Sequence, residues 1–154
     1  MSTRSNIIID LPRGKKVYLY HHYDGYPSGL GWQLVRFLNN NWHSFDDQSY
    51  QHYSLLIDEI LKGKCEKQFY DYEKSEDGWK EDNSFMLIPS RSDMAGDSEY
   101  DYTIKIRHNK PVHITCQKVR AWEEERVVFD GFVPELYEQF QNYNEEDWYK
   151  LNAI

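Results

Sequence analysis

Cysteine is scarce in this chain of 154 residues: Cys65 and Cys116 are the only two, and they form no CxxC pair. No signal-peptide core precedes them, because the N-terminus is polar and the apolar run 7–9 is too short. We therefore expect reduced thiols in a cytoplasmic protein. No apolar run approaches the roughly 20 residues of a membrane-spanning helix, so we expect no membrane association.

Positive charge is also in short supply, with 18 Lys and Arg against 26 Asp and Glu and a net charge of −8. This balance argues against binding the phosphate backbone of DNA or RNA, which needs a basic footprint. An acidic surface can instead cover a basic protein surface or mimic nucleic acid, or it can simply keep the chain in solution.

Motifs for nucleotide and metal binding are missing as well. The glycines at 25, 29 and 31 do not form GxGxxG, and there is no Walker lysine, HExxH or second histidine pair. The sequence therefore predicts no cofactor and no metal.

Aromatic residues are abundant: thirteen Tyr, seven Phe and five Trp make up 16% of the chain. They indicate a core built largely from rings, with a stacking platform for a base or sugar as the alternative. The length suits one domain. We therefore expect a single α+β domain over residues 1–154, with a loose tail over 1–5.

Hydrophobic periodicity locates the secondary structure of this domain. It predicts an antiparallel or mixed sheet of about five strands, with two main helices packed on one face. Lys16 to His22 is apolar on both sides and is expected to be a central strand, while 85–88 is expected to be a short buried strand. Further segments are a strand at 6–9, a hairpin over 100–107 and 112–117, a strand at 126–129, main helices at about 28–39 and from 44–47 to Gly63, and short helices after Pro134 and Asn144.

A strand gives way to a polar loop within residues 17–32, which contain His21, His22 and Asp24. Such junctions are frequent positions for ligand-binding groups. Side chains alternate along a strand, so the two histidines are expected on opposite faces, whereas His22 and Asp24 can share one. A His–Asp pair can act as a general base with its orienting carboxylate or as half of a metal site, while Asp24-Gly25 can also be a purely structural turn.

The glycines after this turn begin the first main helix. The segment Ser28-Gly-Leu-Gly31 is expected to leave backbone N–H groups free, and such a helix start attracts a carboxylate or phosphate. Tyr26 and Trp32 could stack on the ligand, although Trp32 equally suits the core. We therefore predict a ligand-binding loop, with His22 and Asp24 as catalytic candidates, made of His21, His22, Asp24, Gly25, Tyr26, Ser28, Gly29 and Gly31.

The segment His21-His-Tyr-Asp-Gly-Tyr-Pro-Ser-Gly-Leu-Gly31 resembles the HxxDGYPxGxG-type motif of a group of small uncharacterised phage and bacterial proteins. Those proteins are similar in size and carry an acidic, aromatic stretch like residues 97–102 here. The resemblance implies a phage or mobile-element origin, and with it a place in the host cytoplasm. It carries over no catalytic residue, because the group has no assigned activity.

These features favour a non-enzymatic binding protein. We expect an accessory protein that sequesters a small, nucleotide-like ligand or blocks a basic partner protein. Aromatic side chains anchor protein interfaces and carboxylates steer basic targets. The candidate partner contacts on this basis are Trp79, Trp122, Glu123, Glu124 and Glu125.

Two other functions remain open. The chain could be a small hydrolase or nucleotide-processing enzyme, with His22 as base, Asp24 as orienting group or metal ligand, and the helix N–H groups as an anion hole. It could also be a structural or assembly component of a phage particle, in which the edge of the predicted hairpin mediates oligomerisation.

Overall fold

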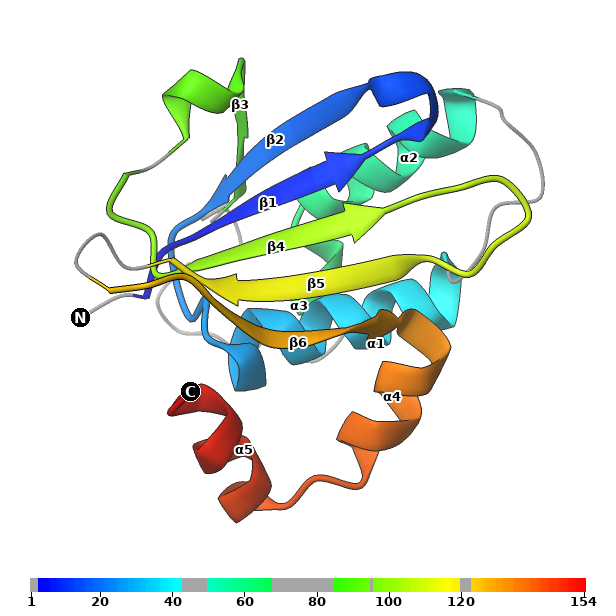
Figure 1. Cartoon of the computed structure of the whole chain (residues 1–154). Helices are drawn as coiled ribbons and strands as arrows, with labels where there is room; N and C mark the ends of the chain where they lie inside the picture. Colours follow the sequence, from blue (N-terminus) through cyan, green and yellow to red (C-terminus); the bar gives the residue numbers. More distant parts are fainter. Residues whose placement is uncertain (1–2, 43–49, 68–84, 95, 120–122) are drawn as a thin grey trace, which may run out of the picture.

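The fold is built on a six-stranded mixed sheet with the strand order β3-β2-β1-β4-β5-β6. The structure is a computed structural model that describes residues 3–42, 50–67, 85–94, 96–119 and 123–154 (Figure 1). It confirms the predicted α+β class, with six strands rather than about five. The strands are β1 (Ser5–Asp10), β2 (Lys16–His21), β3 (Phe85–Ile88), β4 (Tyr100–Lys105), β5 (His113–Lys118) and β6 (Arg126–Phe132).

Helices α1, α2 and α3 lie behind the sheet in the view of Figure 1, and α4 and α5 follow β6. Gly63 ends α2 with a φ of 72°, as expected for the residue after a helix. The expected start of α2 at 44–47 lies outside the described residues. The helices are α1 (Trp32–Asn41), preceded by a π-helical turn (Pro27–Gly31), then α2 (Tyr50–Leu61), α3 (Lys64–Lys67), α4 (Val133–Gln141) and α5 (Glu145–Asn152).

One strand pair in the sheet is parallel. Residues Ser5 to Asp10 of β1 pair with Tyr100 to Lys105 of β4 in the same direction, whereas every other neighbouring pair is antiparallel. The β1–β2 hairpin with β3 therefore forms one half of the sheet, and the β4–β5–β6 meander forms the other. The parallel pair joins the two halves.

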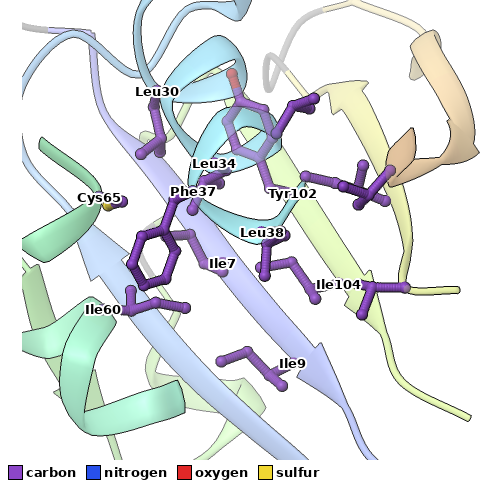
Figure 2. Packing of buried hydrophobic residues seen from close by; sticks show 14 of the residues in the cluster. Ile7, Ile9, Leu30, Leu34, Phe37, Leu38, Ile60, Cys65, Tyr102 and Ile104 are labelled. Atoms are coloured by element: carbon purple, nitrogen blue, oxygen red, sulfur yellow. The ribbon is translucent and has the colours of Figure 1, made fainter. Parts of the chain in front are cut away.

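The core lies between the sheet and α1 and α2. Side chains of Ile7, Ile9 and Ile104 alternate along their strands and point at the helices, where they meet Leu34 and Leu38 (Figure 2). The helical spacing of Leu30, Leu34, Phe37 and Leu38 predicted this apolar stripe, and all four are fully or almost fully buried.

The opposite side of the sheet, here called the open face, is only partly covered. Ile8, Tyr18, Tyr20 and Thr103 alternate with the core residues, and each is half-buried. Such a face, with partly exposed aromatic and aliphatic side chains on a rigid support, is suited to binding.

Aromatic side chains hold α4 and α5 against α1. The Trp32 ring lies 6.1 Å from the Phe140 ring of α4 and 5.9 Å from the Trp148 ring of α5, measured between centroids. The high aromatic content is therefore explained in part by the core.

Asn144 caps α5 as predicted: its side chain accepts from the Asp147 N–H, and the Asp147 carboxylate accepts from the Asn144 N–H.

Four expectations need correction. The tail expected over 1–5 is too long, because Ser5 belongs to β1 and is fully buried. β2 lies inside the sheet as expected, but it is not buried on both sides, because Tyr18 and Tyr20 are only half-buried. β3 is an edge strand with Met86 and Leu87 more than half exposed, rather than a buried strand. The β4–β5 hairpin lies inside the sheet and offers no edge for oligomerisation.

Among the described helices, none is long and apolar enough to cross a membrane.

The core predicts the effect of truncating a leucine. Leu34→Ala in α1 should lower the free energy of unfolding by about 2–5 kcal/mol, because Leu34 is fully buried and its removal leaves a cavity. Leu55→Ala in α2, where the side chain is 46% exposed, is the control and should cost less than about 1 kcal/mol. Urea denaturation of both variants measures this difference, and equal losses would contradict the packing described.

Candidate functional site

The two histidines at the end of β2 point to opposite sides of the sheet, as strand alternation requires. His21 is 1% exposed and lies on the core side, where its ring centroid is 4.4 Å from that of Phe85. His22 is half-buried on the open side with Tyr20, whose hydroxyl oxygen lies 2.7 Å from its Nδ1. His21 therefore packs in the core, and His22 is the one near solvent.

His22 and Asp24 do not form the predicted pair. Asp24 adopts a left-handed conformation with a φ of 50°, which turns the chain away from the strand direction. Its carboxylate accepts from the Tyr26 hydroxyl at 3.3 Å, and its carbonyl accepts from the Leu30 N–H at 2.9 Å. The arrangement is a turn in which each of the two side chains interacts with a tyrosine.

The backbone N–H groups at the start of the helical turn are not free, which corrects the prediction of an anion-binding helix start. The Ser28 N–H donates to Oδ1 of Asn152 at 3.1 Å, and the Asn152 amide donates to the Ser28 hydroxyl at 2.8 Å. The Gly29 and Gly31 N–H groups donate to the Tyr26 carbonyl. Asn152 of α5 therefore occupies the position that an anion would take.

The glycines of this loop allow the backbone to approach its neighbours closely. A Cβ at Gly29 would lie 2.4 Å from the Asp24 carbonyl oxygen, and one at Gly31 would lie 3.2 Å from the Tyr102 hydroxyl. The Tyr102 hydroxyl in turn donates to the Gly25 carbonyl at 2.6 Å in a buried hydrogen bond. The glycine pattern is therefore explained by packing of the loop onto the sheet.

Tyr26 and Trp32, the two expected stacking residues, both pack against the core cluster. The Trp32 ring contacts α4 and α5, and the Arg36 guanidinium carbon lies 4.7 Å from its centroid. The core alternative for Trp32 is therefore correct.

A pocket of about 220 Å³ lies on the open face, here called the sheet pocket. Ile8 and Tyr18 come from neighbouring strands β1 and β2, Asp101 comes from β4, and Met94 and Glu125 come from the segments on either side. Arg91, Lys16 and Asp10 complete its charged lining. The sheet pocket thus combines apolar surface with five charged side chains.

Asp101 is the most notable group in the sheet pocket. Its Oδ1 accepts from Asn6 Nδ2 at 3.1 Å and from the Ser98 hydroxyl at 3.3 Å. Burial raises the pKa of the Asp101 carboxyl, and the nearby Glu125 raises it further, whereas the hydrogen bonds from Asn6 and Ser98 and the charge of Arg91 lower it. The carboxylate is therefore held in place by buried partners but is poorly solvated.

Sequence reasoning missed Asp101 as a site residue. Alternation along 100–107 places Asp101 on the polar side of the hairpin, opposite Tyr100 and Tyr102. Its partner Asn6 lies on another strand of the sheet, and no local pattern links the two residues. A carboxylate on the exposed side of a strand is ordinarily solvated, so only the packing identifies this one.

The predicted partner contacts are only partly described. Glu123, Glu124 and Glu125 are exposed, and Glu125 lines the sheet pocket. Trp79 and Trp122 lie outside the described residues.

The described residues give little support to a nucleophile or a metal centre. Cys65 and Cys116 are buried thiols, and burial raises the pKa of Cys116 far above its usual range. A thiol with a raised pKa is a poor nucleophile. No group of three or more His, Cys, Asp or Glu side chains suited to a metal ion occurs in the described part of the chain.

Comparisons with protein-family models, with curated proteins and with solved structures find no match to this chain.

The loop packing predicts the effect of a single methyl group. Gly29→Ala should lower the free energy of unfolding by about 1–3 kcal/mol, because the new Cβ would collide with the Asp24 carbonyl. Gly96→Ala is the control and should be close to neutral, since no described atom lies within 4 Å of its Cβ position. The sign of the change in the free energy of unfolding is informative, because Gly→Ala in a helical turn stabilises a protein when the new Cβ meets no collision. Thermal denaturation of both variants tests this.

The raised pKa of Asp101 predicts a pH-dependent effect on stability. In the pH range between the unfolded-state pKa near 3.8 and the higher folded-state pKa, the folded protein binds more protons, so this carboxyl contributes less stability as the pH rises. Asp101→Asn removes this loss while retaining an acceptor for Asn6. The stability of Asp101→Asn relative to the parent chain should therefore increase with pH above about pH 4.

Urea denaturation from pH 4 to pH 7 measures this difference, with Glu138→Gln at an exposed carboxylate of α4 as the control. A relative stability of Asp101→Asn that falls with increasing pH would show that Arg91 and the hydrogen bonds outweigh the burial of Asp101.

Proposed function

We propose that this chain is a non-enzymatic binding protein whose sheet pocket takes a basic side chain of a partner protein. The observation that carries the proposal is the Asp101 carboxylate, held by Asn6 and Ser98 in a pocket of about 220 Å³ on the open face. A poorly solvated carboxylate gains a compensating charge when a lysine or arginine approaches it.

The lining of the sheet pocket supports a long basic side chain. Ile8, Tyr18 and Met94 supply apolar surface for its aliphatic stem, while Asp101 and Glu125 supply acceptors for its charged end. Arg91 and Lys16 also line this pocket and are exposed, and Arg91 already lowers the pKa of Asp101, so an incoming cation competes with Arg91 for this carboxylate.

Net charge supports the same kind of partner. The chain carries −8, and the exposed run Glu123–Glu125 ends at the sheet pocket. A carboxylate-rich rim accelerates encounter with a basic surface and weakens encounters with acidic ones. The inhibitor role in a phage setting, which the loop motif suggests, is a further part of this proposal.

The two alternative functions receive less support. In the described residues, His22 and Asp24 each interact with a tyrosine rather than with each other, so the hydrolase hypothesis lacks its catalytic pair. The assembly hypothesis relied on the edge of the hairpin, and both of its strands are interior.

A labelled lysine-rich peptide provides a defined probe of the sheet pocket. Fluorescence anisotropy should show saturable binding that Asp101→Asn combined with Glu125→Gln weakens about tenfold, a loss of about 1.4 kcal/mol. Glu138→Gln combined with Glu146→Gln removes the same charge from α4 and α5 and should weaken binding less than twofold.

Two results would contradict the proposal. Equal weakening by the two double variants would mean that the peptide responds only to net charge. A failure of the lysine-rich peptide to saturate at low salt would mean that the pocket does not bind basic side chains.

A further inference from the structure

A second pocket, here called the hairpin pocket, lies where β4 turns into β5. It has a volume of about 180 Å³ and is lined by Lys105, Arg107, Lys110, Pro111, His113 and Phe132. Three of these six side chains are basic and none is a carboxylate. This is the reverse of the charge balance of the chain as a whole, which is −8.

Two of the three basic side chains are the lysines Lys105 and Lys110. Lys105 and Lys110 are exposed, and neither belongs to an ion pair within the described part of the chain. Gathering uncompensated ammonium groups in one concavity raises the local positive potential, which favours a bound anion.

Arg107 is held in place by contacts on its other side. Its Nη1 donates to the Asp10 carbonyl at 3.1 Å and to the Ile106 carbonyl at 2.8 Å, and its Nη2 donates to Asp10 Oδ2 at 3.2 Å. A guanidinium has five N–H donors, so these three bonds leave two for a ligand. The group is oriented before any ligand arrives, which lowers the entropy cost of binding.

The remaining wall of the hairpin pocket is flat and apolar. The Phe132 side chain is 39% exposed, and its ring lies at 82° to the His113 ring, with the two centroids 5.3 Å apart. Asp130 does not line the pocket: its Oδ1 accepts from the Thr115 hydroxyl at 2.6 Å and lies 3.2 Å from His113 Nε2. The exposed part of the Phe132 ring offers apolar surface to a ligand.

We infer from this geometry that the hairpin pocket binds a mononucleotide. The phosphate lies among Lys105, Arg107 and Lys110, which provide charge-assisted hydrogen bonds, and the base stacks on Phe132. The pocket is smaller than the roughly 300–1,000 Å³ that encloses a drug-sized ligand, so part of the nucleotide stays in solvent.

This site is independent of the sheet pocket. Asp101 and Lys105 are four residues apart on β4, which places them about 13 Å from each other along the open face. The Asp10–Arg107 ion pair stands between the two sites, with Asp10 lining the sheet pocket and Arg107 lining the hairpin pocket. The variants that test the two pockets share no residue, so the two proposals can fail separately.

Titration of the purified chain with adenosine monophosphate, adenosine and inorganic phosphate tests the inference, with binding followed by calorimetry and by backbone amide chemical shifts. Adenosine monophosphate should bind with a Kd below about 1 mM, and at least about tenfold more tightly than either adenosine or phosphate. The amide shifts should be confined to residues 105–113 and to the neighbourhood of Phe132.

Variants separate the two parts of the site. Lys105→Gln combined with Lys110→Gln should weaken binding of adenosine monophosphate about tenfold or more, whereas Lys62→Gln combined with Lys150→Gln, on α2's C-terminal side and on α5, should leave it unchanged. Phe132→Ala should weaken binding of the nucleotide but not of phosphate. Circular dichroism confirms that each variant is folded.

Three results would overturn the inference. The first is the absence of saturable nucleotide binding below about 1 mM. The second is equal affinity for phosphate and for adenosine monophosphate, which would mean that the pocket binds anions and does not recognise the base. The third is equal weakening by the two lysine double variants.

Discussion

The buried hydrogen bond from the Tyr102 hydroxyl to the Gly25 carbonyl is the contact on which the arrangement of loop, sheet and helices depends. It joins the loop after β2 to the middle of β4. The loop can approach Tyr102 this closely because Gly31 has no side chain at the point of contact. Burial raises the pKa of the Tyr102 hydroxyl, so the tyrosine remains a neutral donor. The position of the loop sets the start of α1, and Asn152 then attaches α5 to the same turn.

Local pattern accounts for the part of the fold that sequence alone could predict. The β4–β5 hairpin, the apolar stripe of α1 and the Asn144 cap each depend on residues within a few positions of one another, and all three are confirmed. The order of the strands could not be predicted, because the pairing of β1 with β4 joins residues far apart in sequence and no turn specifies it.

In the candidate site, too, features set by neighbouring residues could be predicted and features set by distant residues could not. The loop at 21–31 was found because its composition is unusual, but whether its N–H groups were free depended on Asn152, near the other end of the chain. Asp101 went unnoticed for the same reason, since Asn6 holds it from another strand. Glycines that suggest a ligand site in sequence proved to mark close backbone contact, which single-sequence reasoning does not distinguish from phosphate binding.

The parallel pairing of β1 with β4 has a consequence for how the chain reaches this structure. Ser5 is opposite Tyr100, so the middle of the sheet forms only after a large loop closes. Loop closure is slow relative to the formation of hairpins, and proteins dominated by distant contacts fold slowly. The β4–β5–β6 meander is made of neighbouring strands and can assemble first, as a template onto which β1 and β2 dock. Until they do, the β4 edge is exposed to other chains, and the rate of that docking sets how long the chain is vulnerable to aggregation.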